Sequence, residues 1–176
     1  MTAVIENRTD LPRAVVVRTV VWTLRQMRID RDDLCIRVRM TDGTGHVGHF
    51  YNGPVAQKQG FDFLITARIP REFVPYVMAS RMKQGPTAID PRTWREALVC
   101  IVAHEGMHVI QALRPRPDLG YHRKPASPHW RKTKKGSVWV EPKLVTVHVD
   151  RPMFSELEAE WAEHDLLKIY RGRRKQ

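Results

Sequence analysis

Residues 90–115 read DPRTWREALVCIVAHEGMHVIQALRP, and this stretch has the start signal, the apolar content and the stop signal of one long helix. Asp90 followed by Pro91 is a strong helix start, because aspartate is favoured at the N-cap and proline at the first helical position. Arg114-Pro115 ends the helix, since the residue before a proline disfavours helical backbone. We therefore expect a helix from Pro91 to about Leu113.

The pentapeptide HEGMH, residues 104–108, lies inside this predicted helix. Its two histidines are four residues apart, so they share one helical face and both imidazoles can reach one metal ion. Cys100 shares that face, which turns the histidines toward the protein interior. Glu105 lies beside them, where a carboxylate can take a proton from a metal-bound water. The pattern predicts His104 and His108 as metal ligands and Glu105 as a catalytic base.

A catalytic zinc ion needs a third protein ligand and an open position for water. A third histidine six residues after His108 is missing, because Arg114 occupies that position. The segment SELEAEWAEHD, residues 155–165, offers four glutamates instead. At about 100° per residue, Glu158 falls on the apolar side of this predicted helix and the other three glutamates fall on the opposite side. We therefore expect Glu158 as the third ligand, with Glu156 as the alternative. The residues that define the apolar side are Ala162, Leu166 and Ile169, and the remaining glutamates are Glu160 and Glu163.

Four other histidines and one aspartate are weaker candidates for the site. His164 lies off the apolar side of its helix, His148 alternates outward from its valine neighbours, and two more histidines lie in a basic loop. We expect all four to be surface residues, and we expect Asp165 to be a surface carboxylate rather than a partner of a ligand imidazole. The loop histidines are His122 and His129.

The pattern of apolar residues predicts one α+β domain that spans residues 1–176. We expect a small, mostly antiparallel sheet packed on the HEGMH helix and on a C-terminal helix that carries the third ligand. The expected helices cover 12–27, 72–82, 91–113 and 154–170, and the expected strands cover 34–40, 47–51, 61–69, 137–141 and 144–149.

Positive charge is concentrated in two segments of the chain. The formal net charge is +11, and the whole excess lies in a basic loop, 114–136, and a basic tail, 168–176. Concentrated positive charge attracts polyanions through counterion release, so nucleic acid is a candidate partner of both segments. Tyr121 and Trp130 lie among the loop's basic residues, where their rings could stack on unpaired bases.

Composition excludes a membrane protein and a small disulfide-rich scaffold. The longest unbroken apolar run, from Leu98 to Ala103, has six residues, far below the roughly 18 that a membrane span needs. The N-terminal residues lack the apolar stretch of a secretory signal, and two cysteines cannot form a disulfide framework. We therefore expect a cytoplasmic protein without a membrane partner. The cysteines are Cys35 and Cys100.

The motif HEGMH, followed 50 residues after His108 by Glu158-Ala159, resembles the zincin metallopeptidases. The resemblance is to the glutamate-ligand branch, the gluzincins, in which the third ligand is often a glutamate followed by alanine on the next helix. In size and layout the chain is similar to the SprT-like and ImmA/IrrE-like proteases. SprT-like members act near DNA, but their third ligand is usually histidine, and this chain has no zinc ribbon. Substrate binding in extended form along an edge strand is also implied, with 61–69 as the expected strand.

Resemblance and spacing together imply a zinc-dependent peptidase that acts on protein or peptide substrates. In this reading Zn²⁺ is held by His104, His108 and Glu158, and Glu105 takes the proton of the attacking water. The resemblance also implies a donor that stabilises the oxyanion, and the candidates are Tyr121, His148 and His164. Two alternatives stay open: a nucleic-acid-binding protein with a structural zinc site, and a zinc hydrolase of a non-peptide amide.

Overall fold

The structure is a computed structural model of the chain. It describes the backbone of residues 3–42, 47–75, 78–79, 88–114, 123–125, 129–133, 136–140, 144–146 and 151–173, and the side chains of 3–42, 48–75, 89–114 and 156–173. The chain divides into two compact units. The first contains residues 1–114 and 153–176, and the second contains residues 115–152.

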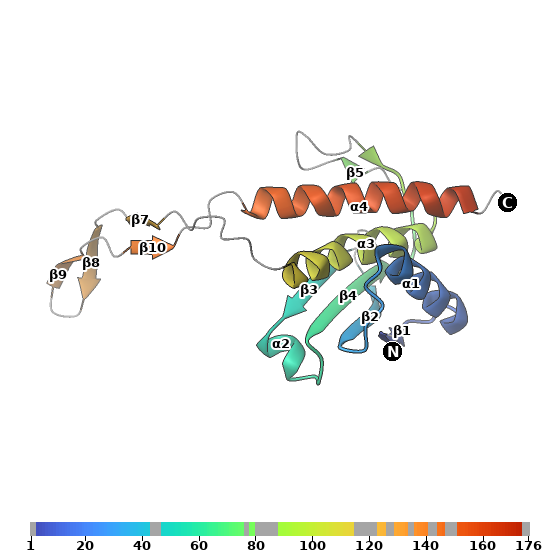
Figure 1. Ribbon diagram of the computed structural model, residues 1–176, viewed down its shortest axis with the longest axis horizontal. Coiled ribbons are helices and arrows are strands. Elements are labelled where there is room, and N and C mark those ends of the chain that lie inside the picture. Colours follow the sequence, from blue (N-terminus) through green and yellow to red (C-terminus); the bar gives the residue numbers. More distant parts are fainter. Residues whose placement is uncertain are drawn as a thin grey trace. The chain divides into compact units, whose positions relative to one another are not determined.

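The first unit is built on a four-stranded sheet with the order β1-β2-β4-β3 (Figure 1). Its strands are β1 (Val4–Arg8), β2 (Leu34–Thr41), β3 (Val47–Asn52) and β4 (Phe63–Pro70). The α+β class is confirmed, but the sheet is mixed rather than mostly antiparallel. The β1–β2 and β2–β4 pairs are parallel, and only β3–β4 is antiparallel. Two features make the sheet mixed. The N-terminal strand β1, which is not expected from the sequence, is joined to β2 through a helix, as parallel neighbours require. In addition, β4 lies between β2 and β3, antiparallel to β3 and parallel to β2.

The strand expected to form the edge of the sheet lies instead in its interior. Residues 63–70, β4, pair with β2 on one side and with β3 on the other. Among the described residues, β3 has a partner only on its β4 side. The edge strand next to the HEGMH helix is therefore β3.

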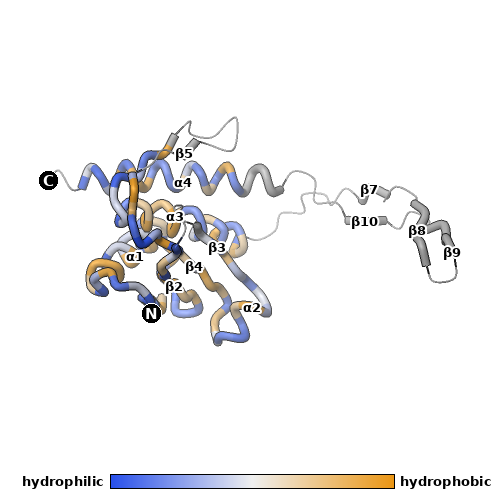
Figure 2. The backbone as a smooth tube through the Cα atoms, turned by 180° about the vertical axis from the view of Figure 1, so that it is seen from behind, coloured by the Kyte–Doolittle hydropathy of each residue, from blue (hydrophilic) through white to orange (hydrophobic). Residues whose placement is uncertain are grey.

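Two long helices, α1 (Arg13–Met27) and α3 (Trp94–Leu113), cover one face of the sheet (Figure 1). The core lies between them and the strands, and its fully buried side chains include Val20, Ile36, Ile65 and Leu98. Figure 2 shows hydrophobic residues along these strands and helices, whereas the C-terminal helix is mainly hydrophilic. Burial of this apolar surface is the main source of the unit's stability.

Helix α3 begins later than predicted. Its N-cap is Thr93, whose side-chain oxygen accepts a hydrogen bond from the backbone N–H of Glu96 at 3.2 Å. Asp90, the expected cap, is bound instead by the Arg171 guanidinium, 2.8 Å away. By length and composition α3 could cross a membrane, but most of it is buried inside the fold, as in a core helix of a soluble protein.

The long C-terminal helix, α4 (Arg151–Arg173), packs antiparallel on α3 (Figure 1). Leu167 packs with Cys100, and Leu166 packs with Val99 and Ala103. This antiparallel contact brings the first turns of α4 beside the last turns of α3. It therefore places the glutamates of α4 next to the HEGMH segment.

Two short elements complete the first unit. Helix α2 (Pro54–Gln57) joins β3 to β4, and β5 (Met78–Ala79) pairs with β6 (Ala88–Ile89). The helix expected over 72–82 is wrong, because residues 72–75 are irregular and 78–79 form a strand. Pro75 explains the irregular backbone, since it disfavours helical geometry in the residue before it.

The described residues of the second unit form two strand pairs. In one, β7 (Arg123–Pro125) pairs with β10 (Leu144–Thr146); in the other, β8 (His129–Thr133) pairs with β9 (Gly136–Val140). The two strands expected here correspond to β9 and β10, but each pairs with a strand of the basic loop rather than with the other. The side chains of this unit lie outside the described residues.

Candidate metal centre

Helix α3 presents the two histidines of HEGMH on one side, as the spacing predicts. The ring centroids of His104 and His108 are 5.1 Å apart. Both side chains are largely buried, with exposed fractions of 20% and 16%. Phe50 of β3 lies beside His108, with ring centroids 6.1 Å apart. The sheet and helix therefore hold both imidazoles in a partly closed environment.

The carboxylate of Glu156, from the first part of α4, lies between the two imidazoles. Its Oε2 is 3.2 Å from His104 Nε2, and its Oε1 is 3.4 Å from His108 Nε2. One ligand atom from each of these three residues lies within 4.8 Å of the other two. Two imidazole nitrogens and a carboxylate oxygen thus converge on one small volume, which is the donor arrangement of a metal site.

The other ring nitrogen of each histidine is held by a polar side chain. His104 Nδ1 is 2.5 Å from Glu163 Oε1, and His108 Nδ1 is 2.8 Å from Gln111 Oε1. These contacts fix the orientation of the rings and leave Nε2 directed at Glu156. Partners of this kind accompany most metal-binding histidines and raise the basicity of the ligand.

Glu163 changes the proton affinity of His104. Burial lowers the pKa of this imidazole, but the hydrogen bond and negative charge of Glu163, together with the charges of Glu105 and Glu156, outweigh burial, so the pKa is raised. Glu163 is buried although it carries a carboxylate. A buried carboxylate is costly unless it is paired, and His104 is the partner that the structure provides.

Glu105 lies on the sheet side of α3 and is buried. Burial raises the pKa of its carboxyl group, against the opposing influence of His104 and His108. The space for this side chain comes from Gly48 in the edge strand β3. A Cβ atom on Gly48 would lie 2.3 Å from Glu105 Oε1. The carboxylate is therefore in direct contact with the strand that borders the site.

Glu158, the predicted third ligand, is not one of the three converging groups. Its two oxygens are 2.8 and 2.9 Å from Nη1 of Arg114, and Oε2 accepts a hydrogen bond from Gln111 Nε2 at 3.0 Å. Burial raises the pKa of Glu158, but the contacts with Arg114 and the hydrogen bond from Gln111 outweigh burial, so the pKa is lowered. The structure places the alternative, Glu156, next to the histidines. Among the described residues, Gln111 links Glu158 to the site, because it contacts both Glu158 and His108.

The buried side of α4 is not the apolar side expected from the sequence. Ile169, which belongs to the expected apolar side, is 51% exposed. The side that packs on α3 is centred near Glu163, about 140° away from Glu158. In the sequence, this side is marked by glutamates spaced four and three residues apart. Buried leucines follow them on the same side of the helix. The residues on it are Glu156, Ala159, Glu160, Glu163, Leu166 and Leu167.

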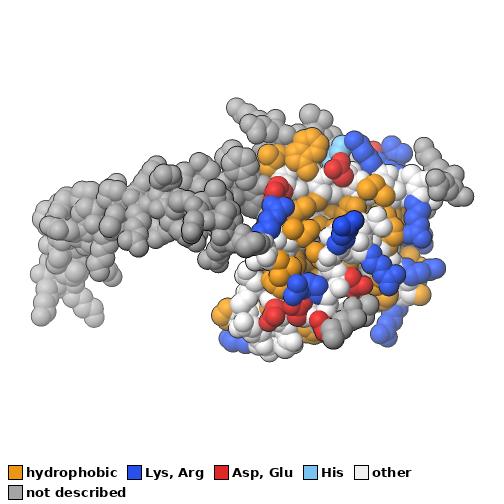
Figure 3. Space-filling view, in the orientation of Figure 1, with side chains coloured by type: hydrophobic (Ala, Val, Ile, Leu, Met, Phe, Trp, Pro, Cys, Tyr) orange, Lys and Arg blue, Asp and Glu red, His pale blue; other side chains and the backbone are white. Residues whose placement is uncertain are grey.

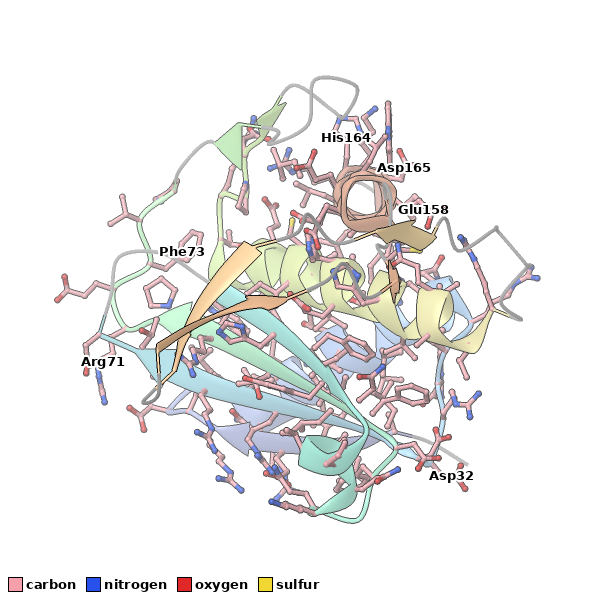
Figure 4. All side chains as sticks on the ribbon, turned by 90° about the vertical axis from the view of Figure 1, so that its left-hand side faces the viewer. Asp32, Arg71, Phe73, Glu158, His164 and Asp165 are labelled. Atoms are coloured by element: carbon pink, nitrogen blue, oxygen red, sulfur yellow. The ribbon has the colours of Figure 1, made fainter. Side chains whose placement is uncertain are left out.

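The remaining candidates divide into two groups. His164 and Asp165 lie on the side of α4 turned away from α3 (Figure 4). His164 Nδ1 is 3.6 Å from Asp165 Oδ1. The side chains of four other candidates lie outside the described residues. These are Tyr121, His122, His129 and His148.

Comparisons with protein-family models, with curated proteins and with solved structures find no match for this chain. The case for a functional site therefore rests on the residues and their geometry.

Proposed function

We propose that the protein is a zinc-dependent hydrolase of peptide bonds, with His104, His108 and Glu156 as the metal ligands. The observation that carries this proposal is the convergence of both Nε2 atoms on the Glu156 carboxylate, at 3.2 and 3.4 Å. A pair of surface histidines would not need a buried glutamate and a glutamine to fix their Nδ1 atoms.

The donor set favours zinc over other common cations. Two imidazoles and one carboxylate form a set typical of catalytic zinc, which keeps the fourth position for water or substrate. Calcium and magnesium prefer sites made of oxygen atoms. The partners of Nδ1, Glu163 and Gln111, are of the type that supports ligand histidines.

Each residue of the site then has a defined part in hydrolysis. When bound, zinc supplies a Lewis acid that polarises the scissile carbonyl and acidifies a water molecule. Glu105 accepts a proton from the attacking water and later delivers it to the leaving amine. The raised pKa that burial gives to Glu105 brings its proton affinity closer to neutral pH, which suits a group that must both take and release a proton.

The edge strand supports a peptide as the substrate. β3 pairs only with β4 among the described residues, so its other edge offers backbone groups to an extended chain. Phe50 of this strand packs on His108, and Gly48 contacts Glu105. A peptide added along β3 would therefore pass beside the metal ligands and the base.

The same proposal locates the enzyme in the cytoplasm. Cys35 and Cys100 are both free and buried, and free thiols are typical of a reducing compartment. Burial raises the pKa of the Cys35 thiol to about 11, which keeps it protonated and unreactive at neutral pH.

The deciding experiment measures zinc content and cleavage of an unfolded protein in parallel. Wild type, Glu156→Ala, Glu105→Gln and, as a matched control on the exposed side of α4, Asp165→Ala would be compared. We expect about one zinc per chain in wild type and in Asp165→Ala, and loss of zinc in Glu156→Ala. We expect Glu105→Gln to keep zinc but to lose cleavage, and wild-type cleavage to stop with EDTA and return with added zinc.

Three results would count against the proposal. Undiminished zinc in Glu156→Ala would show that Glu156 is not a ligand. Wild-type rates in Glu105→Gln would show that Glu105 is not the base. Failure of wild type to take up zinc after reconstitution would exclude the enzyme altogether.

A further inference from the structure

The sheet has a second face, opposite to the core, and this face is rich in arginine. Ile36 and Val38 of β2 point into the core, so the residues that alternate with them point to the other face. These include Arg37 and Arg39. The register extends the pattern to β1 and β4, and we call the resulting surface the outer face. Its members on the three parallel strands are Val4, Glu6, Arg8, Cys35, Arg37, Arg39, Leu64, Thr66 and Arg68.

Three arginines lie side by side across this outer face. Arg8 of β1 is paired in register with Arg39 of β2, and Arg39 with Arg68 of β4. Neighbouring strands are about 4.8 Å apart, so the row spans about 10 Å. Arg8 and Arg68 are exposed and Arg39 is half-buried. Like charges directly opposite one another are destabilising in a sheet. A contribution to folding stability therefore does not explain this row.

The row has too few acidic partners in the part of the chain that the structure describes. Glu6 is shared between Arg8 and Arg37 at 2.7 Å each. The carboxylates that follow β1 and β2, Asp10 and Asp42, both pair with Arg71.

Arg39 is the least satisfied member of the row. Its Nε atom is buried, and no hydrogen-bond acceptor for it lies among the described residues. No ion pair of Arg39 or of Arg68 is found there either. An anion that lies along the row would supply the charge that these groups lack.

Two aromatic rings extend the same face at the edge of the sheet. His49 of β3 is in register with Thr66, and Tyr51 with Leu64, so both project on the arginine side. Their ring centroids are 6.1 Å apart, and both side chains are partly exposed. Arginine and lysine side chains are also spread over the side of the molecule that Figure 3 draws. A row of guanidinium groups beside aromatic rings is the combination that binds single-stranded nucleic acid, with phosphates on the cations and bases on the rings.

We propose that the outer face of the sheet binds single-stranded nucleic acid. Arg8, Arg39 and Arg68 contact successive phosphates, and the rings of His49 and Tyr51 stack on bases. The aromatic rings favour a nucleic acid over an acidic protein or an anionic membrane, which offer nothing to stack. This surface lies on the opposite face of the sheet from Gly48 and Glu105, so the inference does not depend on the proposed hydrolase activity.

The test is the affinity of the full chain for a fluorescent oligothymidylate of about 15 nucleotides, which matches the usual site sizes of single-strand binders. Wild type would be compared with Arg39→Gln/Arg68→Gln and with Arg13→Gln/Arg18→Gln, which removes the same charge from exposed positions on α1. At about 0.1 M salt we expect the sheet variant to bind at least tenfold more weakly and the α1 control to change less than threefold. The slope of log affinity against log salt should fall by about 1.4 in the sheet variant, because two phosphate contacts are lost.

Stability and competition measurements test whether the sheet variant is folded and whether binding is specific to nucleic acid. The melting temperature of the sheet variant should equal or exceed that of wild type, since like-charge contacts are removed. If this variant fails to fold, the single variant Arg68→Gln, at an exposed position, replaces it. We expect Arg68→Gln to bind the oligonucleotide at least threefold more weakly than wild type. The proposal is overturned if wild type does not bind, if both double variants weaken equally, or if polyglutamate or anionic phospholipid vesicles displace the oligonucleotide at equal charge concentration.

Discussion

Gly48 of the edge strand and Glu105 of helix α3 are so close that a Cβ atom on Gly48 would lie 2.3 Å from Glu105 Oε1 and 2.7 Å from its Cγ. No side chain larger than hydrogen fits between this strand and the carboxylate. The absence of a side chain at one strand position thus sets the position of the proposed catalytic base. It also brings that base beside the backbone along which we expect the substrate to bind.

Gly48→Ala should therefore damage catalysis without removing the metal. The added methyl group must displace the Glu105 carboxylate, because the three heavy atoms nearest to it all belong to Glu105 and none to a proposed metal ligand. We expect cleavage to fall about a hundredfold, as a displacement of about 1 Å in an active site can cause, with zinc content unchanged. Gly172→Ala is the matched control, because a Cβ there meets no atom within 4 Å. Unchanged turnover in Gly48→Ala would show that Glu105 tolerates the displacement and is not held by this contact.

Glu158 and Gln111 should tune metal affinity rather than create the site. Gln111 contacts His108 Nδ1 and is itself held by Glu158, which Arg114 anchors. Loss of such an outer partner typically weakens metal binding 10- to 100-fold. We expect Gln111→Ala and Glu158→Ala to raise the zinc dissociation constant by about tenfold, and Asp165→Ala to leave it unchanged. Competition with a chromogenic chelator measures this, and a complete loss of zinc in Glu158→Ala would make it a ligand after all.

The sequence was sufficient to predict the part of the site that lies on one helix. Spacing within a single helix determines which side chains share a face, so His104, Glu105 and His108 could be placed without any knowledge of packing. The proposed third ligand comes from a different helix, and its identity depends on which side of α4 packs on α3. The positions of the apolar residues alone indicate the wrong side of α4, because Glu160 and Glu163 are buried against α3 and Ile169 is exposed.

The sheet was harder to predict than the helices for a related reason. Residues 63–70 alternate clearly, but alternation does not determine which strands lie on either side. The short N-terminal strand, Val4–Arg8, has an arginine and a glutamate on its outer face and so shows little apolar signal. Its parallel pairing with β2 depends on a contact between distant residues, which a local pattern does not contain. The role of Gly48 likewise could not be predicted, because it depends on the packing of α3 against β3.

Arg171 joins the start of α3 to the end of α4, and its removal should destabilise the first unit. Its guanidinium contacts Glu96 Oε2 and Asp90 Oδ1, each at 2.8 Å. The Glu96 side chain is only 6% exposed, so removal of this cation leaves a buried carboxylate with less compensation. We expect Arg171→Met to lower the free energy of unfolding by about 2–3 kcal/mol. Arg173→Met, at an exposed position on the same helix, should change it by less than about 0.5 kcal/mol. Urea unfolding measures both, and equal effects would show that the contacts of Arg171 contribute no special stability.

The ion pair between Glu6 and Arg37 should make stability depend on acid pH. A hydrogen bond from Arg37 is the largest cause of the lowered pKa of Glu6, which falls from 4.5 to about 2. A carboxylate with a depressed pKa stabilises the folded state fully above its unfolded value of 4.5, and this contribution is lost as the pH falls toward 2. Both side chains are partly screened by water, so we expect the pair to contribute about 1–2 kcal/mol at neutral pH. Glu6→Gln should therefore be less stable than wild type by that amount at pH 7, and the difference should shrink steadily between pH 4.5 and pH 2. In an Arg37→Met background the same substitution should show a much weaker dependence on pH, because the main cause of the pKa shift is gone. A difference between wild type and Glu6→Gln that stays constant over this range would contradict the assignment.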